Sequence, residues 1–248
     1  MDLTAYRASP SEQLRIADLL SLMPDTFSNA LDIGARDGYI SRRMAERCDH
    51  VTALDLAAPA IVHDKIECVT GDATALSFAD NSFDLAICAE VLEHIPPHLL
   101  ASACKEISRV TKQSVIIGVP FNQDIRLGST HCPACSKTNP PWGHLNSFTL
   151  DKLTHLFAPL QVRKVNFVGA NQPRTNALSH ALMEHAGHPF GTYTQAETCV
   201  FCSAAIHHTD NRTLTQRLAT RAAHLLNSLQ QQVQSAQPAW IHILFEKT

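Results

Sequence analysis

The stretch LDIGARDG at residues 31–38 decides the fold class of this chain. It closes an apolar run that begins at Ala30, turns at Gly34 and leads after Gly38 into a helical pattern. A short apolar run followed by a glycine turn and a helix is the repeating unit of an open α/β sheet. Glycines at such a turn let the backbone approach a ligand closely. We therefore expect a strand, a turn and a helix at a ligand-binding edge.

Further apolar runs extend this unit into a sheet. The expected strands cover residues 30–33, 51–54, 66–69, 83–88, 115–119, 162–168 and 240–245, and the expected helices cover residues 10–22, 38–45, 96–110, 150–157, 177–185 and 214–232. The first helix has Ser9 as N-cap, Pro10 at its first position and Glu12 placed to complete a capping box. Strands alternating with helices imply right-handed crossovers. The prediction is an α/β protein with a Rossmann-like, mostly parallel seven-stranded sheet and helices on both faces.

Length and composition favour one domain, residues 1–248, with an irregular insertion. The 248 residues are 45% hydrophobic and 17% charged, which is ordinary for a globular protein with a core that can grow to about 250 residues. Apolar runs are far shorter than the ~20 residues that cross a bilayer, and the N-terminus lacks a secretory pattern. We expect a cytoplasmic protein without a membrane segment.

The charge pattern speaks against a polyanionic partner. The formal net charge is −3, and no basic cluster exceeds Arg42-Arg43. Phosphate contacts require a concentrated basic surface, so no nucleic-acid partner is expected. The oligomeric state stays open at this point.

Acids and glycines stand where the first four expected strands end. They are Asp32, Gly34, Gly38, Asp55, Asp72 and Glu90. Ligands of an open α/β sheet bind beyond these strand ends, and an acid after the second strand can accept hydrogen bonds from both hydroxyls of a ribose. An NAD-binding fold would also place a glycine turn and an acid at these strand ends, but the GxGxxG fingerprint of such folds is absent from this sequence. The NAD alternative also gives no role to Asp72 or to the segment EVLEH.

The succession of these motifs is more specific than any one of them. Residues 25–120 contain four motifs in a fixed order and spacing: LDIGARDG, ALDL, GDA and FDLAICAEVLEHIP. This succession resembles the class I S-adenosylmethionine-dependent methyltransferases, particularly their small-molecule branch. The resemblance implies a small-molecule methyl acceptor. It also implies that Asp32, Gly34 and Gly38 line the methionine part of the cofactor, that Asp55 binds its ribose and Asp72 with Ala73 its adenine, and that Glu90 lies beside the methionine. The chain departs from the family at Arg36, where glycine is common, which puts the contact with the cofactor carboxylate in question.

Methyl transfer from a sulfonium is an in-line displacement that depends mainly on alignment. A base is needed only if the acceptor arrives protonated, and the candidates are His94 and His144, with Glu93 as a possible partner. His94 could instead cap the following helix or pack under the cofactor. Some family members hold a divalent metal near the acceptor with an acid and histidine of this neighbourhood, and this alternative stays open.

Two CxxC pairs lie in segments without periodicity, residues 121–149 and 170–211. Cys132 and Cys135 form one pair and Cys199 and Cys202 the other. Each pair places two thiolates on a tight turn, and four soft ligands suit zinc. We predict a structural zinc site, although the sequence separation exceeds a standard finger loop. The alternatives are a redox dithiol, two unrelated surface turns, or a site in which His131 or His144 replaces one cysteine. The other four cysteines are expected in the core on helices or strands: Cys48, Cys68, Cys88 and Cys104.

The segment CPAC followed by PPWGHLNSFT is also similar to methyltransferases in which a zinc-knuckle insertion covers the acceptor pocket, which implies a lid. Within it, residues 139–142 read NPPW, a signature of amino-methylating enzymes. In those enzymes the motif directly follows the fourth strand, a place taken here by Ala89-Glu90-Val91. We interpret it as a proline-rich turn.

Three functions are open from the sequence. The first is an enzyme that methylates a small molecule. The second is a macromolecular methyltransferase whose zinc insertion docks a protein or RNA, and the third is a non-catalytic module that binds S-adenosylmethionine.

Overall fold

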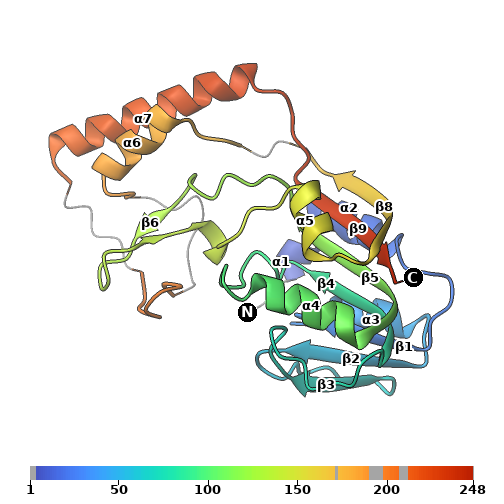
Figure 1. Ribbon diagram of the computed structural model, residues 1–248. Helices are drawn as coiled ribbons and strands as arrows, with labels where there is room; N and C mark the ends of the chain where they lie inside the picture. The colour runs from blue at the N-terminus through green and yellow to red at the C-terminus, as the bar shows by residue number, and fades with distance from the viewer. Residues whose placement is uncertain (1–3, 171–172, 190–197, 207–211, 248) are drawn as a thin grey trace. The chain divides into compact units, whose positions relative to one another are not determined.

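A seven-stranded sheet organises the larger part of the chain (Figure 1). In the computed structural model, the described residues are 4–170, 173–189, 198–206 and 212–247. The sheet order is β3-β2-β1-β4-β5-β9-β8, where β1 is Asn29–Ile33, β2 His50–Asp55, β3 Ile66–Thr70, β4 Phe83–Ala89, β5 Thr111–Pro120, β8 Gln161–Val168 and β9 Trp240–Glu246. The first five strands pair in parallel, and β9 lies antiparallel between β5 and β8. The predicted Rossmann-like, mostly parallel sheet is confirmed.

Short and long helices connect these strands. They are α1 Thr4–Arg7, α2 Pro10–Leu20, α3 Tyr39–Ala45, α4 Leu100–Val110, α5 Leu150–Leu156, α6 Ala177–His185 and α7 Leu214–Val233. The N-cap prediction for α2 holds, because the Ser9 hydroxyl accepts from the Glu12 N–H at 3.4 Å. The predicted capping box is wrong in its second half: the buried Glu12 carboxylate instead accepts hydrogen bonds from Arg15. Helix α4 also begins later than predicted, because residues 96–99 close a turn in which the Leu99 N–H donates to the Pro96 carbonyl at 2.8 Å.

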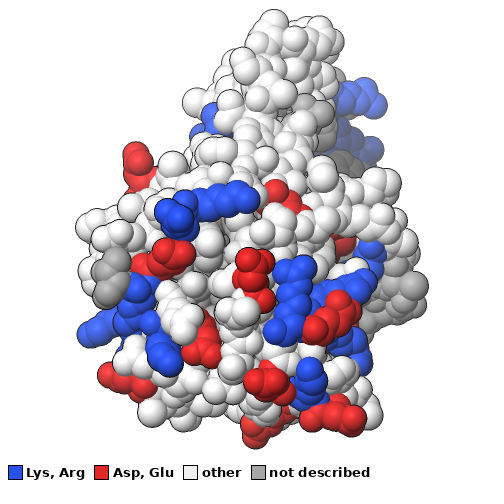
Figure 2. Space-filling model, turned by 90° about the vertical axis from the view of Figure 1, so that its right-hand side faces the viewer, with Lys and Arg blue, Asp and Glu red and all other residues white. Residues whose placement is uncertain are grey.

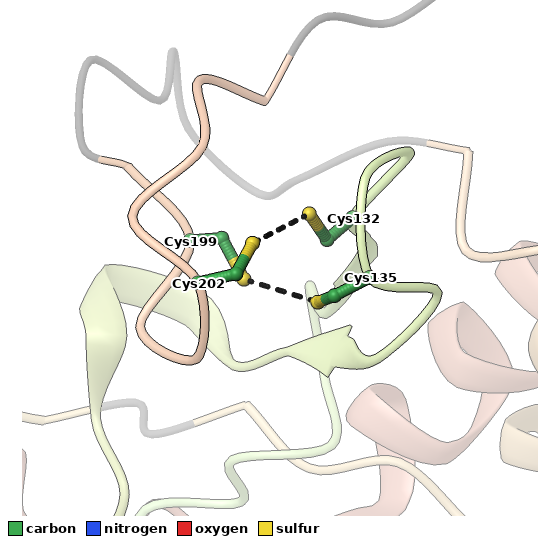
Figure 3. A group of neighbouring side chains, drawn as sticks. All are labelled: Cys132, Cys135, Cys199 and Cys202. Atoms are coloured by element: carbon green, nitrogen blue, oxygen red, sulfur yellow. Dashed lines mark hydrogen bonds between the residues drawn. The ribbon is translucent and has the colours of Figure 1, made fainter.

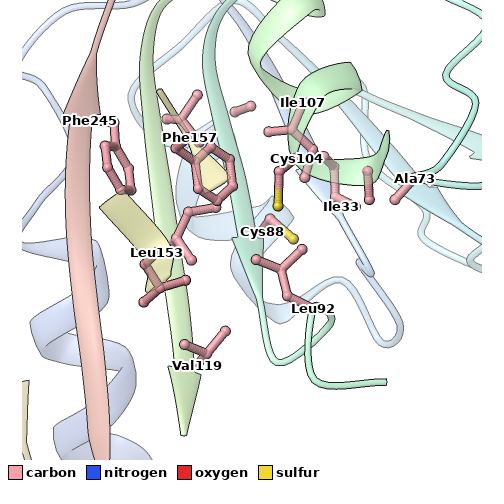
Figure 4. Packing of buried hydrophobic residues seen from close by; sticks show 14 of the residues in the cluster. Ile33, Ala73, Cys88, Leu92, Cys104, Ile107, Val119, Leu153, Phe157 and Phe245 are labelled. Carbon is pink, nitrogen blue, oxygen red and sulfur yellow. The ribbon is translucent and has the colours of Figure 1, made fainter. Parts of the chain in front are cut away.

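Two apolar layers enclose the sheet, as expected for strands covered on both faces. Alternate residues of β1 divide between them: Leu31 and Ile33 face the layer that includes α4 and α5, whereas Ala30 faces the layer that includes α2 and α3. Figure 4 shows the first layer, where the ring of Phe157 stacks on that of Phe245 with centroids 5.0 Å apart.

The chain divides into two compact units. Unit 1 contains residues 1–121, 148–170 and 238–248, and therefore the whole sheet. Unit 2 contains residues 122–147 and 171–237, with the short hairpin of β6 Thr130–His131 and β7 Thr138–Asn139, the 3-10 helix η1 Pro141–Gly143, and α6 packed on α7. Unit 2 thus contains α7 and most of the two segments that were predicted to be irregular, residues 121–149 and 170–211. Residues 171–172, 190–197 and 207–211 of the predicted segment 170–211 lie outside the described residues.

The remaining cysteines mostly follow their predicted places. Cys88 on β4 and Cys104 on α4 are fully buried, and Cys68 on β3 is half-buried. Cys48 is buried but lies in the turn after α3, because that helix ends at Ala45. Within the described ranges, no helix is long and apolar enough to cross a membrane.

Candidate functional site

Four neighbouring parallel strands bring the predicted cofactor residues to one edge of unit 1. Strands β3, β2, β1 and β4 lie side by side in that order, so their carboxyl ends meet at the same edge. The predicted residues stand at or just after these ends: Asp32, Gly34 and Gly38 at β1, Asp55 at β2, Asp72 and Ala73 at β3, and Glu90 at β4. This is the edge at which open α/β sheets bind ligands.

The turn after β1 depends on its first glycine. Gly34 has a φ of +77°, and a Cβ added there would lie 2.3 Å from Cγ2 of Val91, which follows β4. Its N–H donates to the Leu54 carbonyl at 2.8 Å, so the turn is tied to β2. Only glycine allows both this conformation and this approach. The turn therefore passes close to the segments that follow both neighbouring strands.

Two acids at the edge are held in fixed orientations by backbone donors. One oxygen of Asp55 accepts from the Arg36 N–H at 3.0 Å, and the other accepts from the Leu56 N–H at 2.7 Å. Asp72 accepts from the N–H and the hydroxyl of Thr74, both at 2.8 Å. Neither acid is deeply buried, so both keep acceptor capacity for a ligand. Arg36 supplies its N–H from a left-handed conformation with φ +51°.

Asp32 is the buried acid of the edge. Its side chain accepts from the Ser41 hydroxyl at 2.5 Å, and the residue is 2% exposed. Burial raises the pKa of Asp32 to about 6, while the hydrogen bonds from Ser41 oppose the shift. Asp32 therefore connects β1 to α3, and its predicted place along the methionine part of the cofactor stays a prediction.

A charged network that sequence reasoning missed lies beside Glu90. Arg15 on α2 is 2% exposed and donates to Glu12 through Nε and Nη2 at 2.8 and 2.9 Å. Its Nη1 lies 3.6 Å from Oε1 of Glu90, and the Trp240 indole donates to Oε2 of Glu90 at 3.4 Å. Burial raises the pKa of Glu90, and Arg15 opposes the shift. The i,i+3 spacing of Glu12 and Arg15 was the one sequence signal for this network, but such spacing is typical of an ion pair on an exposed helix surface.

Two further side chains follow β4 in unit 1. Glu93 is fully buried, and burial raises its pKa well above the ordinary value, with the neighbouring Glu90 adding to the shift. His94 is exposed, and its N–H donates to the Val91 carbonyl at 3.0 Å. Although one side chain is buried and the other exposed, a carboxylate oxygen of Glu93 and a ring nitrogen of His94 lie within 4.8 Å of each other, close enough to share a metal ion. The catalytic role of His94 stays a prediction.

The other predicted base, His144, belongs to unit 2. It follows η1 as the C-cap residue and is 8% exposed. Its Nδ1 lies 2.6 Å from Oε1 of Gln123, a hydrogen bond that fixes the ring orientation. The role of His144 as a base stays a prediction as well.

The four cysteines of the two CxxC pairs converge in unit 2 (Figure 3). The Sγ atoms of Cys132 and Cys202 are 3.6 Å apart, those of Cys135 and Cys199 are 3.8 Å apart, and all four lie within 4.8 Å of one another. A tetrahedral zinc with Zn–S bonds of about 2.3 Å requires sulfurs about 3.8 Å apart. The donor set and its spacing therefore fit zinc.

The two pairs also share one backbone design. In the first, the Cys132 N–H donates to the Lys137 carbonyl and the Ser136 N–H donates to the Cys132 carbonyl, at 3.0 and 2.9 Å. In the second, the Cys199 N–H donates to the Ala204 carbonyl and the Ser203 N–H to the Cys199 carbonyl, both at 2.8 Å. Ser136 and Ser203, each next after the second cysteine, have φ of +57° and +59°. Two matched turns thus bring the four sulfurs together, and the spacing of the cysteines in the sequence did not reveal this match.

The NPPW segment supports the cysteine turns. Asn139 is fully buried, and its Oδ1 accepts from the Val200 N–H of the second turn at 2.9 Å. Its side-chain nitrogen donates to the Pro140 carbonyl at 3.3 Å. The amide of Asn139 thus links the first cysteine segment to the second.

Comparison with known proteins agrees with the fold. Residues 31–118 match the family model of a methyltransferase domain. The chain is similar to the ubiquinone/menaquinone biosynthesis C-methyltransferase of Roseobacter denitrificans, with 39% identity over 77 residues, or 26% of this chain and 31% of that protein. The match therefore spans less than a third of the relative.

Solved structures extend the likeness to nearly the whole chain. The N-methyltransferase NodS of Bradyrhizobium japonicum, bound to S-adenosylhomocysteine, has a TM-score of 0.55 at 16% identity and covers 98% of this chain and 91% of its own. The 1,6-didemethyltoxoflavin-N1-methyltransferase of Burkholderia thailandensis has a TM-score of 0.55 at 14% identity, with 99% and 81% covered. At such identities the likeness concerns the fold.

These likenesses show that the chain has the Rossmann-like fold of the solved methyltransferases, with the strand order β3-β2-β1-β4-β5-β9-β8. Residues 31–118, which match the model of a methyltransferase domain, contain both the glycine turn and the acids.

Proposed function

We propose that this chain transfers the methyl group of S-adenosylmethionine to a small-molecule acceptor. The observation that carries the proposal is the joint position of the glycine turn, Asp55 and Asp72 at the carboxyl ends of adjacent parallel strands. Backbone donors orient the carboxylates, so Asp55 suits the ribose hydroxyls and Asp72 the adenine side of the cofactor. S-adenosylmethionine would supply an electrophilic methyl group, and the protein would supply alignment and exclusion of water.

A small acceptor is favoured over a macromolecular one. The face drawn in Figure 2 carries interspersed acidic and basic side chains rather than a broad basic area. The name of the toxoflavin enzyme refers to a small-molecule acceptor, and that of the Roseobacter relative to quinone biosynthesis. These observations support a metabolite as the acceptor.

We infer that Cys132, Cys135, Cys199 and Cys202 bind a structural zinc. Four thiolates complete a closed tetrahedral set, which leaves no coordination position for a substrate. The zinc would join two chain segments that are distant in sequence. We keep the acceptor-side lid, and His94 and His144 as bases, as parts of this proposal.

Calorimetric titration with S-adenosylhomocysteine tests the cofactor site. Asp55→Ala should weaken binding at least about tenfold, because it removes a charged acceptor from the ribose. Asp49→Ala, an exposed acid just before the amino end of the same strand, is the matched control and should leave affinity unchanged. Full affinity in Asp55→Ala would remove the ribose assignment, and absence of binding by the unchanged protein would remove the proposed function.

A further inference from the structure

Two carboxyl groups after β4 have oxygens without hydrogen-bond partners. Glu93 is 0% exposed, and within the described residues neither of its oxygens has a hydrogen-bond partner in another residue. Oε1 of Glu90 is also buried, and no group in the described part of the chain forms a hydrogen bond with it. Buried polar atoms are normally satisfied, and an exception requires an explanation. Both acids belong to unit 1 and stand at its ligand-binding edge, so a bound ligand is the natural explanation.

The nearby arginines are already engaged with other acids. Arg15 binds Glu12 with two nitrogens, and it reaches Glu90 only at 3.6 Å. Arg7 donates to Asp37 at 2.8 and 3.2 Å and also to Glu12. Arg7 pairs with Glu12 and Asp37, and Arg15 pairs with Glu12 and Glu90, so the ion pairs of these two arginines do not include Glu93. The edge is therefore suited to a ligand that brings positive charge.

The two carboxyl groups differ in access. The Glu90 side chain is 28% exposed and follows the strand end directly. Glu93 lies one turn further and is closed off from solvent. By the family resemblance, Glu90 lies beside the methionine part of the cofactor, whose α-amino group is a cation. Glu93 is then left for a second positive charge.

We propose that Glu93 recognises a positive charge at the methyl-transfer position, and that the acceptor is an amine methylated on nitrogen. The inference rests on the proposed function and names its substrate class. A cation at Glu93 would form a charge-assisted hydrogen bond. A neutral hydroxyl or carbon acceptor would supply no charge to hold Glu93 ionised, so the buried carboxyl group would stay protonated and form no charge-assisted hydrogen bond.

The chemistry balances with Glu93, in place of His94 or His144, as proton acceptor. An ammonium R–NH3+ gives one proton to the Glu93 carboxylate and becomes R–NH2. Its nitrogen lone pair then forms the new N–C bond, while the C–S bond of the cofactor breaks and its electron pair stays on sulfur. The products are R–NH2+–CH3, neutral S-adenosylhomocysteine and a protonated Glu93, which passes its proton to water only after the products leave and water enters the site.

A pair of cofactor analogues tests this proposal without the unknown acceptor. Sinefungin carries a protonated amine where S-adenosylmethionine carries its methyl, whereas S-adenosylhomocysteine carries nothing there. Glu93→Gln should weaken sinefungin at least about tenfold in calorimetric titration and change S-adenosylhomocysteine by less than about twofold. Glu90→Gln should weaken both ligands, because both carry the α-amino group. Glu67→Gln, an exposed acid on β3, is the isosteric control and should change neither.

The outcomes separate the two proposals. Unchanged sinefungin affinity in a Glu93→Gln protein with wild-type melting temperature overturns the inference and leaves the proposed function intact. Binding of neither analogue by the wild-type chain overturns the proposed function itself. A sinefungin preference that is lost in EDTA and restored by Mg²⁺ also overturns the inference, because a metal would then be the group that Glu93 holds. An O-methylated or C-methylated product from a metabolite extract overturns it equally.

Discussion

Arg36 shows how one residue both departs from the family pattern and explains it. Its φ of +51° lies in the left-handed region, which costs a residue with a Cβ about 1–2 kcal/mol. Glycine is common in the family at this position because it avoids that cost. The function of the position is carried by the backbone N–H that donates to Asp55, and any residue except proline supplies it. Arg36 therefore keeps the backbone hydrogen bond to Asp55, and its left-handed conformation costs stability.

Arg36→Gly is expected to stabilise the protein by up to about 1 kcal/mol, since relief of backbone strain exceeds the added entropy of the unfolded chain. Arg36→Val should destabilise it by more than about 1 kcal/mol, because a β-branched residue fits this region worst. Urea unfolding followed by circular dichroism measures both. Arg43→Gly, inside α3, is the control and should cost about 1 kcal/mol. An equal loss of stability in Arg36→Gly would contradict the strain argument.

Helix α2 shows what an element gains from tertiary context. Its capping serine follows from the sequence and is confirmed. The partners of Glu12 and Arg15 are not predictable, because burial converts an i,i+3 surface pair into part of a network with Glu90 of a strand end 75 residues further along. The local sequence pattern thus predicts the helix and its first residue, whereas the charged contacts of the helix depend on the elements that pack over it.

Arg15→Met is expected to destabilise unit 1 by about 3 kcal/mol, because it leaves the Glu12 carboxylate buried without its main partner. The double variant Glu12→Leu/Arg15→Met should recover most of that loss, since removing both charges also removes the desolvation cost. Chemical denaturation of the wild type, both single variants and the double variant gives the coupling energy. Additive losses would show that the pair does not act as a buried unit.

At the scale of the whole molecule, predictability follows the range of the interactions. The sheet could be predicted because each strand carries its own apolar run, and an acid or glycine follows at the ends of β1 to β4. The residue type and CxxC spacing of the four cysteines suggested metal ligands, but their convergence depends on how two segments distant in the chain pack together. Matched left-handed serines and the Asn139 bridge bring those segments together, and neither feature has a periodic signal. The orphaned Glu93 is likewise visible only after packing, because exposure and partners are properties of the fold.

The division into two units predicts a divided response to metal removal. If zinc joins the cysteine turns, its loss removes cross-links from unit 2 only, because all four ligands lie there. Chelation, or Cys199→Ser, should abolish slow amide exchange in residues 122–147 and 173–189 while the sheet of unit 1 stays protected. Exchange measured by mass spectrometry, with elemental analysis giving about one zinc per chain, checks this expectation. Cys68→Ser on β3 is the control and should keep the metal. Equal protection of both units without metal would show that the cysteine cluster is held by packing alone.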